Sequence, residues 1–330
     1  MDTIYILGSG SPYPAPHVDR FGSAFVVGHN EEYLMFDCGP AATWKMAKMG
    51  ISPTQIDNLF FTHHHSDHDI DYPCFLTVRW DMGVGKVNDL HAYGPHYTEQ
   101  LTTRLLDPDI GAYAHDGMVR TNHPLSLHSF KLRGGIPLAT MGQDGTNFRE
   151  HPSKMVIAKD IGPGKVCEGK DWEVISAPAE HVQPYLDSLA YRLNTSEGSV
   201  VFTGDTRPCE TVTKLSSGAD VMVISCVGIQ SELDGFAGGE GQYMCGTTGA
   251  GKMAQEAGVK TLVLAHNAAI ASHGPMERAI ADVKSVYDGE VIFGEELMEI
   301  NMGPDIGRES YHAQTLLNSP TRLVTRANRL

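Results

Sequence analysis

The organisation of this chain is decided by the stretch Asn58-Leu59-Phe60-Phe61-Thr62-His63-His64-His65-Ser66-Asp67-His68-Asp69-Ile70. Its apolar run, Leu59 to Phe61, predicts a short buried strand, and the polar cluster after Thr62 predicts the loop at the end of that strand. Imidazoles and a carboxylate at this density are typical ligands of a divalent metal ion. Functional sites are usually built on loops held by a rigid scaffold. We therefore expect the rest of the chain to supply the missing ligands and a substrate pocket.

Length and composition indicate a soluble enzyme of ordinary architecture. A chain of 330 residues can bury roughly 75% of the surface that it exposes when unfolded. Length alone allows two domains or one large α/β domain with an insertion. Hydrophobic residues make up 41% of the chain, and no apolar stretch approaches the ~20 residues that span a bilayer. We expect no membrane segment.

The net charge and the cysteines limit which partners and which cellular compartment are expected. The formal net charge of -15 disfavours nucleic acid as a partner, because Lys and Arg supply most of the affinity for phosphates. The six cysteines are scattered, with no C-x-x-C pair, which predicts buried free thiols in a reducing cytoplasm. The N-terminus enters a strand at once, without a basic leader segment. We therefore expect a cytoplasmic protein that acts on a small-molecule substrate.

Short apolar strands alternate with helices along most of the chain. Residues 107–168 lack this pattern and are rich in Gly, Pro, His and Asp, so we expect residues 104–165 to form an insertion that caps the pocket or makes a dimer contact. Residues 303–330 form a polar tail. We predict a single domain over 1–330, and a homodimer through the insertion or the tail. Strands are expected at 3–7, 23–27, 33–36, 58–62, 90–95, 172–177, 186–193, 199–203, 221–226 and 261–265, with a last strand or pair of strands at 291–300. Helices are expected at 41–49, 96–106, 249–257 and 275–287.

Residues of the types that bind metal ions follow several of these apolar strands. Besides the histidine cluster, the strands are followed by His181, Asp205 and His266. Such a recurrence predicts loops gathered on one rim of a sheet. Because side chains alternate in an extended loop, His63 and His65 point the same way and His64 points away. The predicted metal ligands form one site of His63, His65 and His181, a second site of Asp67, His68 and His266, and a bridge between them at Asp205.

These motifs resemble the metallo-β-lactamase superfamily. The resemblance rests on the H-x-H-x-D-H signature, on Thr203-Gly204-Asp205-Thr206, on Leu262-Val263-Leu264-Ala265-His266, and on the N-terminal Leu7-Gly8-Ser9-Gly10-Ser11-Pro12 and Asp37-Cys38-Gly39. It implies an α/β fold, the αββα four-layer sandwich, with two divalent metal ions at one edge. Zinc is the ion that imidazole and carboxylate favour, with manganese or iron as alternatives. The branch most similar to this chain holds ribonuclease Z, arylsulfatases and phosphodiesterases.

Two members of that branch bear on the substrate. Segments such as His181-Val182-Gln183-Pro184-Tyr185 look like those of chlorothalonil dehalogenase-like enzymes, but that group lacks the first histidine of the signature, which is present here as His63. Ribonuclease Z carries a long arm for tRNA between the equivalents of His181 and Asp205, where this chain has only 23 residues. Its proton-donating histidine also has no counterpart in Met244-Cys245-Gly246-Thr247-Thr248. Both observations favour a small organic substrate.

The mechanism that the resemblance implies is hydrolysis by a hydroxide held between the two ions. Two divalent ions lower the pKa of a shared water toward neutrality, and Asp67 is placed to orient it. Candidates for protonating the leaving group are His273 and Tyr185, and Asp37 is expected to orient a ligand histidine. Residues that could line the pocket are Arg79, Trp80, Tyr113, His115 and His123.

Four functions follow, and the sequence leaves them open. The first is a dinuclear hydrolase of a small ester, lactone, phosphate or sulfate ester. Within the enzyme class, the alternatives are a hydrolytic dehalogenase of haloaromatics and a phosphodiesterase or ribonuclease Z-like nuclease. Outside it, the alternative is an iron redox protein or a metal sensor. Metal analysis separates the last case, because it predicts redox-active iron without hydrolysis.

Overall fold

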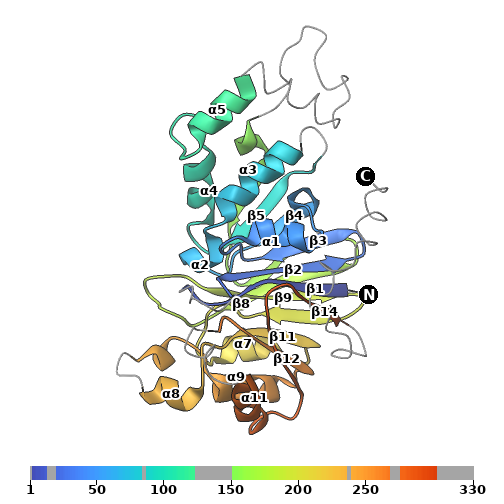
Figure 1. Cartoon of the computed structure of the whole chain (residues 1–330), viewed down its shortest axis with the longest axis vertical. Helices are drawn as coiled ribbons and strands as arrows, with labels where there is room; N and C mark the ends of the chain where they lie inside the picture. Colours follow the sequence, from blue (N-terminus) through green and yellow to red (C-terminus); the bar gives the residue numbers. More distant parts are fainter. Residues whose placement is uncertain are drawn as a thin grey trace.

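A computed structural model describes residues 2–12, 20–83, 87–122, 151–235, 239–267 and 276–302. Within these residues two mixed sheets of seven strands lie face to face, and helices cover the outer face of each (Figure 1). The order of layers is helices, sheet, sheet, helices. The predicted αββα sandwich is therefore confirmed.

The first sheet carries the N-terminal part of the chain and the helices above it in Figure 1. Its strands, in spatial order, are β14 (Met298–Met302), β1 (Asp2–Ser9), β2 (Ser23–His29), β3 (Glu32–Phe36), β4 (Ile56–Phe60), β5 (Leu90–Gly94) and β6 (Val156–Asp160). Its helices are α1 (Ala42–Lys48), α2 (Ser66–Asp69), α3 (Tyr72–Met82), α4 (Thr98–Leu106) and α5 (Ala114–Asn122), with the 3-10 turns η1 (Pro53–Gln55) and η3 (Pro152–Met155).

The second sheet carries the C-terminal half. Its strands, in spatial order, are β13 (Glu290–Phe293), β12 (Thr261–Ala265), β11 (Val221–Ser225), β10 (Ser199–Phe202), β9 (Leu189–Thr195), β8 (Trp172–Pro178) and β7 (Gly164–Glu168). Its helices are α7 (Glu210–Leu215), α8 (Gln230–Gly235), α9 (Thr247–Ala257) and α11 (Met276–Lys284), with the 3-10 turn η4 (Glu240–Gln242). Strands β10 to β13 run parallel, so their carboxyl ends lie at one edge.

Alternation along buried strands builds the layers. In β11, Val221 and Val223 face the core between the sheets, while Met222 and Ile224 face the core under α7, α9 and α11. A strand buried on both faces has a continuous apolar sequence, so these strands are easy to recognise in the sequence. The central core is rich in stacked rings, with Phe36 and Phe202 only 4.3 Å apart between centroids. Packing in the apolar cores fixes the register of the strands. The register in turn fixes the positions of the loops at the strand ends.

The expectation of irregular chain over 107–168 is wrong in two places, at helix α5 (Ala114–Asn122) and in the last part of the range. Residues 152–168 hold η3 and the strands β6 and β7, which are the edge strands of the two sheets. Both strands are largely exposed or half-buried, so they lack the apolar alternation that marks a strand in sequence. The part of the expected insertion at 123–150 and the tail at 303–330 lie outside the described residues.

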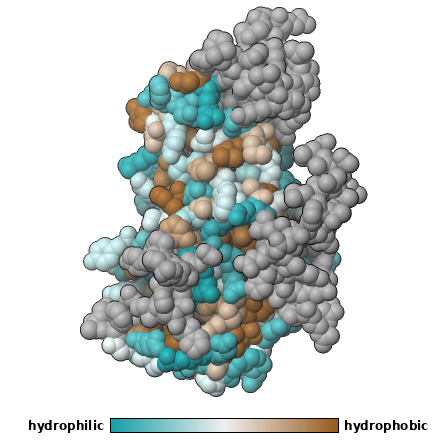
Figure 2. Space-filling model, in the orientation of Figure 1, coloured by the Kyte–Doolittle hydropathy of each residue, from teal (hydrophilic) through white to brown (hydrophobic). Residues whose placement is uncertain are grey.

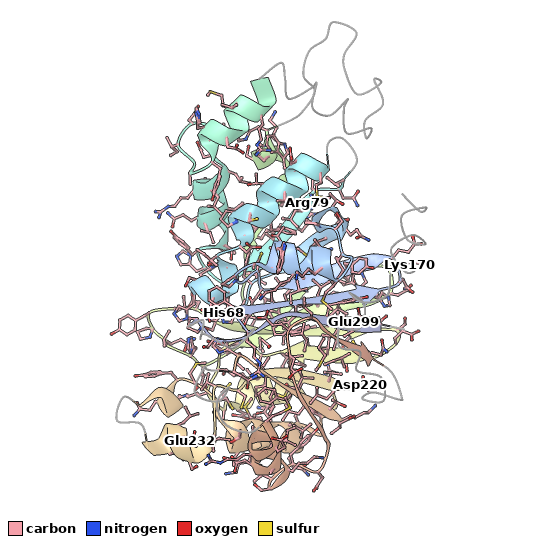
Figure 3. All side chains as sticks on the ribbon, viewed as in Figure 1. His68, Arg79, Lys170, Asp220, Glu232 and Glu299 are labelled. Atoms are coloured by element: carbon pink, nitrogen blue, oxygen red, sulfur yellow. The ribbon has the colours of Figure 1, made fainter. Side chains whose placement is uncertain are left out.

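Helix α3 was not predicted, and two of its residues differ from expectation. Arg79 is buried and donates to the Ile56 carbonyl at 2.9 Å and to Asp57 Oδ1 at 2.7 Å, which ties α3 to the start of β4. Trp80 is buried beside it. Figure 3 shows Arg79 well apart from His68. These two side chains support the fold and do not line the pocket described below.

The described surface carries no long apolar segment. None of the described helices is both long and apolar enough to cross a bilayer. Figure 2 shows hydrophilic and hydrophobic residues interspersed over the described part of the face in view.

Candidate metal centre

Seven side chains from both sheets meet at one edge of the sandwich. His63 and His65 lie in the loop after β4, and Asp67 and His68 lie on α2, directly beyond that loop. The other three follow strands of the second sheet: His181 after β8, Asp205 after β10 and His266 after β12. Every strand delivers its residue at its carboxyl end, so the rim predicted from the sequence exists.

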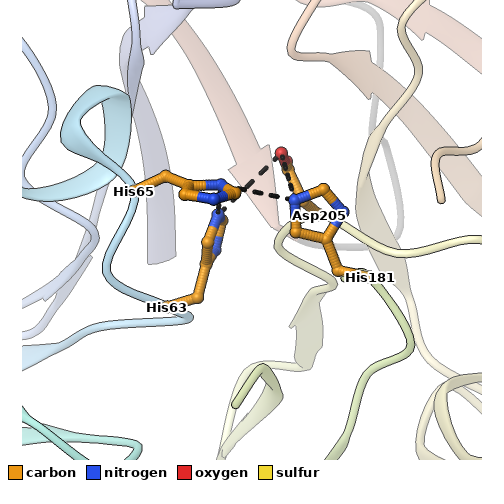
Figure 4. Close-up of side chains that lie close together, drawn as sticks. All are labelled: His63, His65, His181 and Asp205. Carbon is orange, nitrogen blue, oxygen red and sulfur yellow. Dashed lines mark hydrogen bonds and ion pairs between the residues drawn. The ribbon is translucent and has the colours of Figure 1, made fainter. Parts of the chain in front are cut away.

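One group contains His63, His65, His181 and Asp205 (Figure 4). His65 Nδ1 lies 3.1 Å from His63 Nε2 and 3.3 Å from His181 Nε2. The nearer Asp205 oxygen, Oδ2, is 4.0 Å from His63 Nε2 and 3.9 Å from His181 Nε2. Four ligand atoms within 4.8 Å of one another can hold one ion.

The second group contains Asp67, His68 and His266, all buried. Asp67 Oδ2 lies 3.0 Å from His266 Nε2 and 3.7 Å from His68 Nε2. Asp205 also reaches this group, with Oδ1 3.4 Å from His68 Nε2 and Oδ2 3.3 Å from His266 Nε2. A single carboxylate thus borders both groups, which is the bridging position expected for Asp205.

His68 and His181 each have their outer nitrogen held by a group outside the cluster. Asp37 Oδ2 lies 2.7 Å from His68 Nδ1, and the same carboxylate accepts from the Thr62 amide and hydroxyl at 2.7 and 2.8 Å. His181 Nδ1 is 2.9 Å from the Tyr243 carbonyl. Carboxylates and carbonyls in this position fix the ring and its tautomer. The contact of Asp37 with His68 was expected. The contributions of Thr62 and Tyr243 were not, since a carbonyl leaves no trace in sequence.

Unpaired buried atoms show that the cluster is incomplete by itself. His68 Nε2 and Asp205 Oδ1 are buried and lie 3.4 Å from each other, but neither makes a well-formed hydrogen bond with any described residue. Such atoms are costly unless something binds them. Both face the other members of the cluster, and imidazole with carboxylate is a donor set that suits a divalent transition metal. The residues present therefore fit divalent cations.

The electrostatics of the cluster lead to the same conclusion. Burial lowers the pKa of His63 well below its usual range. Burial also opposes a charge on His68, but Asp205 and Asp37 outweigh it and raise the His68 pKa well above its usual range. Burial alone would raise the pKa of Asp205, yet His266 and His68 hold it well below. Neighbouring imidazoles are thus pulled in opposite directions, whereas a bound cation stabilises neutral imidazoles and ionised carboxylates together.

The backbone is strained where it presents these groups. Asp37 and His266 have φ values of 58° and 55°, a region that side-chain-bearing residues rarely adopt. Gly204, directly before Asp205, has a φ of 56°, and a Cβ there would lie 2.5 Å from Thr62 Cβ. Only glycine allows the two loops to approach this closely. Strain of this kind collects at functional sites.

A pocket of 660 Å³ adjoins the cluster through His181. Its walls include the β5–α4 turn at Pro95 and His96, the β6–β7 connection at 161–163, and the loop after β8. Pockets for small ligands usually measure roughly 300–1,000 Å³. Arg79, Trp80, Tyr113 and His115 are not among the residues around it, and His123 lies outside the described residues.

The remaining candidates are placed as follows. His64 points away from the cluster, with Nδ1 3.1 Å from Asp69 Oδ2 and Nε2 2.8 Å from Thr98 Oγ1, as expected. Tyr185 is 92% exposed and makes no hydrogen bond with the cluster among the described residues. His273 lies outside the described residues. The structure therefore does not bring Tyr185 to the cluster, and the prediction for His273 stays untested.

Comparison with known proteins identifies the family. The profile of the Metallo-beta-lactamase superfamily matches residues 17–266. The chain belongs to the metallo-beta-lactamase superfamily. It is a metallo-β-lactamase-fold hydrolase, as its motifs indicated. Proteins of this superfamily typically bind divalent metals, and the seven gathered side chains could hold them.

Relatives named ribonuclease Z align with 67% to 93% of the chain. Ribonuclease Z of Mycobacterium sp. (strain KMS) is 26% identical over 317 residues, covering 93% of this chain and 98% of the relative. Ribonuclease Z of Thermococcus kodakarensis is 29% identical over 242 residues, covering 67% of this chain and 71% of the relative. The resemblance to the branch that holds ribonuclease Z is confirmed.

Solved structures share the fold at lower identity. The metallo-beta-lactamase fold protein YhfI from Bacillus subtilis has a TM-score of 0.62 and 17% identity, covering 90% of this chain and 98% of that one. The short form of human tRNase Z has a TM-score of 0.58 and 19% identity, covering 92% and 99%. These likenesses show the fold alone.

Proposed function

We propose that this metallo-β-lactamase-fold hydrolase is a dinuclear enzyme that hydrolyses a small organic ester, lactone, phosphate or sulfate ester. One observation carries the proposal: two abutting groups of metal-type side chains share Asp205 and open through His181 onto a pocket of 660 Å³. The pocket has the size of a small-molecule site.

His63, His65 and His181 would hold one ion, Asp67, His68 and His266 the other, and Asp205 would bind both. Zinc suits these donors best, with manganese or iron as alternatives. Such ions activate water as a nucleophile near neutral pH and polarise the bond that is attacked. Asp37 keeps His68 oriented through the 2.7 Å contact, and Asp67 would orient the attacking water. His273 and Tyr185 stay predictions for the group that protonates the leaving group.

A nuclease is the second candidate, because the relatives above are named ribonuclease Z. That name argues against excluding nucleic acid on charge alone. The pocket argues for a small substrate, since Arg207 is the only Lys or Arg among the described residues that line it. Dehalogenation of haloaromatics stays the third candidate. A cytoplasmic location and a homodimer also stay predictions from the sequence.

A substrate panel tests the function. Protein loaded with zinc or manganese is assayed on nitrophenyl esters, lactones, nitrophenyl phosphates, bis-nitrophenyl phosphate, sulfate esters, haloaromatics and a precursor tRNA. Turnover of a small ester or lactone without cleavage of the tRNA is the expected result. Cleavage of the tRNA with no turnover of small esters would replace the proposal with the nuclease.

Two substitutions test the ligand assignment. Asp205→Ala removes the carboxylate that borders both groups, and His65→Ala removes the atom at the centre of the first. Each should lose metal and lower activity more than about a hundredfold, because removing mere outer partners of metal ligands already costs 10–100-fold. Metal is counted by mass spectrometry on folded protein. Either variant with two ions per chain refutes the assignment.

A further inference from the structure

The pocket beside His181 has an unusual balance of charge. Among the described residues around it, the acidic side chains are Glu180 and Asp187, and the only Lys or Arg is Arg207. Arg207 is already engaged: its Nε and Nη2 lie 2.7 and 2.6 Å from Glu180 Oε2. This pair neutralises itself and leaves no free cation in the described wall to receive an anionic group.

Asp187 is the acidic residue of the pocket that Arg207 does not neutralise. Its carboxylate has no hydrogen bond or ion pair among the described residues, and its side chain is exposed on the pocket wall. His96, across the pocket, has its Nδ1 3.2 Å from Asp160 Oδ2. An unpaired carboxylate in a wall without a free cation attracts a positive group and repels an anion.

Two other residues around the pocket add to the same chemistry. Ser188 is only 5% exposed and lines the pocket, yet its hydroxyl has no hydrogen-bond partner among the described residues. A buried hydroxyl without a partner can accept an N–H from a ligand. Tyr243 also lines the pocket and is 44% exposed, so its ring is available to a cation. Carboxylate, hydroxyl and aromatic ring together suit an ammonium or guanidinium group.

We infer that the pocket beside His181 binds a cationic group, an ammonium or guanidinium carried on an apolar chain, and that Asp187 selects it. The apolar chain would lie against the apolar part of the wall, which includes Pro95, Ile161 and Leu189. This inference rests on the proposed function, because it names the substrate class of that site.

Binding of two matched probes tests the pocket without requiring catalysis. Choline carries a quaternary ammonium, and 3,3-dimethylbutan-1-ol is its uncharged isostere. Saturation-transfer NMR titrations on full-length, metal-loaded protein should show choline binding about fivefold more tightly than the alcohol, the effect of one charge pair in water. Asp187→Asn should remove this preference. Equal binding of the two probes, absence of choline binding, or an unchanged preference in Asp187→Asn overturns the inference.

Asp171→Asn is the matched control. Asp171 is an exposed aspartate directly before β8, at the opposite end of that strand from His181, and it does not line the pocket. The control removes the same formal charge from the molecule. It should keep the wild-type preference for choline, and an equal loss in both variants would assign the preference to net charge and overturn the role of Asp187.

Kinetics separate the inference from the function on which it rests. Nitrophenyl esters with cationic, neutral and anionic acyl chains of one size should show kcat/KM falling in that order, and Asp187→Asn should level them. Hydrolysis without a charge order would overturn the inference and keep the function. No hydrolysis of any ester, with choline binding that depends on Asp187, would overturn the function and keep the cation pocket.

Discussion

The two ends of the sandwich each bury a histidine against an aspartate, and only one end is left unsatisfied. At the far end, His29 Nδ1 lies 2.8 Å from Asp2 Oδ1, and Asp2 Oδ2 accepts from Thr195 Oγ1 at 2.6 Å. The other nitrogen, His29 Nε2, is 3.0 Å from Asn30 Nδ2. The far-end network therefore satisfies its own polar atoms.

At the metal edge the same pairing is used differently. Asp37 holds His68 Nδ1 at 2.7 Å, but His68 Nε2 is buried without a hydrogen-bond partner among the described residues. The difference shows how a buried histidine that stabilises the fold can be told from one that is prepared for a ligand. A histidine with hydrogen-bond partners on both nitrogens stabilises the fold. A histidine that a carboxylate orients through one nitrogen, and whose other nitrogen lies among metal-type side chains without a hydrogen bond, is prepared for a ligand.

Asp37→Asn should have the largest effect of three matched changes. The amide replaces one carboxylate oxygen with a donor, so either Thr62 or His68 loses its acceptor. Losing such a partner of a metal ligand typically costs 10–100-fold in metal affinity, and activity should fall in parallel. Competition with a chelator measures the affinity. Denaturation with metal removed from both proteins separates this loss from one of fold stability, and unchanged affinity would contradict the orienting role.

Asp2→Asn is the same substitution at the other end. It leaves His29 or Thr195 without its acceptor in a buried network, which should lower the free energy of unfolding by about 1–3 kcal/mol. Metal content and kcat should stay at wild-type values, because the network lies at the end of β1 away from the site. Chemical denaturation and metal analysis check both parts. A variant that loses metal would remove the distinction between the two ends.

The sequence predicted that these polar side chains gather at one edge of the sandwich, and it could do so for a physical reason. Each predicted ligand follows an apolar run, and burial makes such runs visible as strands whose ends must share a rim. Alternation also placed His64 away from His63 and His65, as the structure shows. Asp37 was recognisable because it closes a buried strand in the same way.

The pocket could not be predicted, because the segments that form its walls lie far apart in the sequence and show little hydrophobic alternation. Pro95, the 161–163 connection and Tyr243 come from three separate segments. The edge strands β6 and β7 that hold the 161–163 connection are exposed enough to lose the apolar alternation. The expectation that Arg79 and Trp80 line the pocket was wrong, because both are buried on the missed helix α3 and Arg79 donates to the Ile56 carbonyl of β4. Under the proposed function, the residues that would select the substrate therefore come from the segments whose structure is hardest to predict from the sequence.

The smallest effect is expected at Asp220, which Figure 3 shows on the side of the molecule away from His68. Its carboxylate accepts from the Ser199 amide at 2.8 Å and from Lys260 Nζ at 2.6 Å. Burial would raise the Asp220 pKa, but Lys260 and Ser199 outweigh it and hold that pKa below its ordinary value. A lowered pKa in the folded state means stability that is present above the unfolded pKa of about 3.9 and lost as pH falls through the folded pKa.

Asp220→Asn should therefore lower the free energy of unfolding at pH 7 by less than about 1 kcal/mol, because the ion pair with Lys260 is largely exposed. The difference from wild type should shrink as pH drops below about 4, where the wild-type carboxyl is protonated too. Urea denaturation at a series of pH values measures this, with Asp171→Asn as the control for removing one negative charge. Metal content should not change, and a loss of metal from so distant a substitution would show that the two ends of the sandwich are coupled rather than separate.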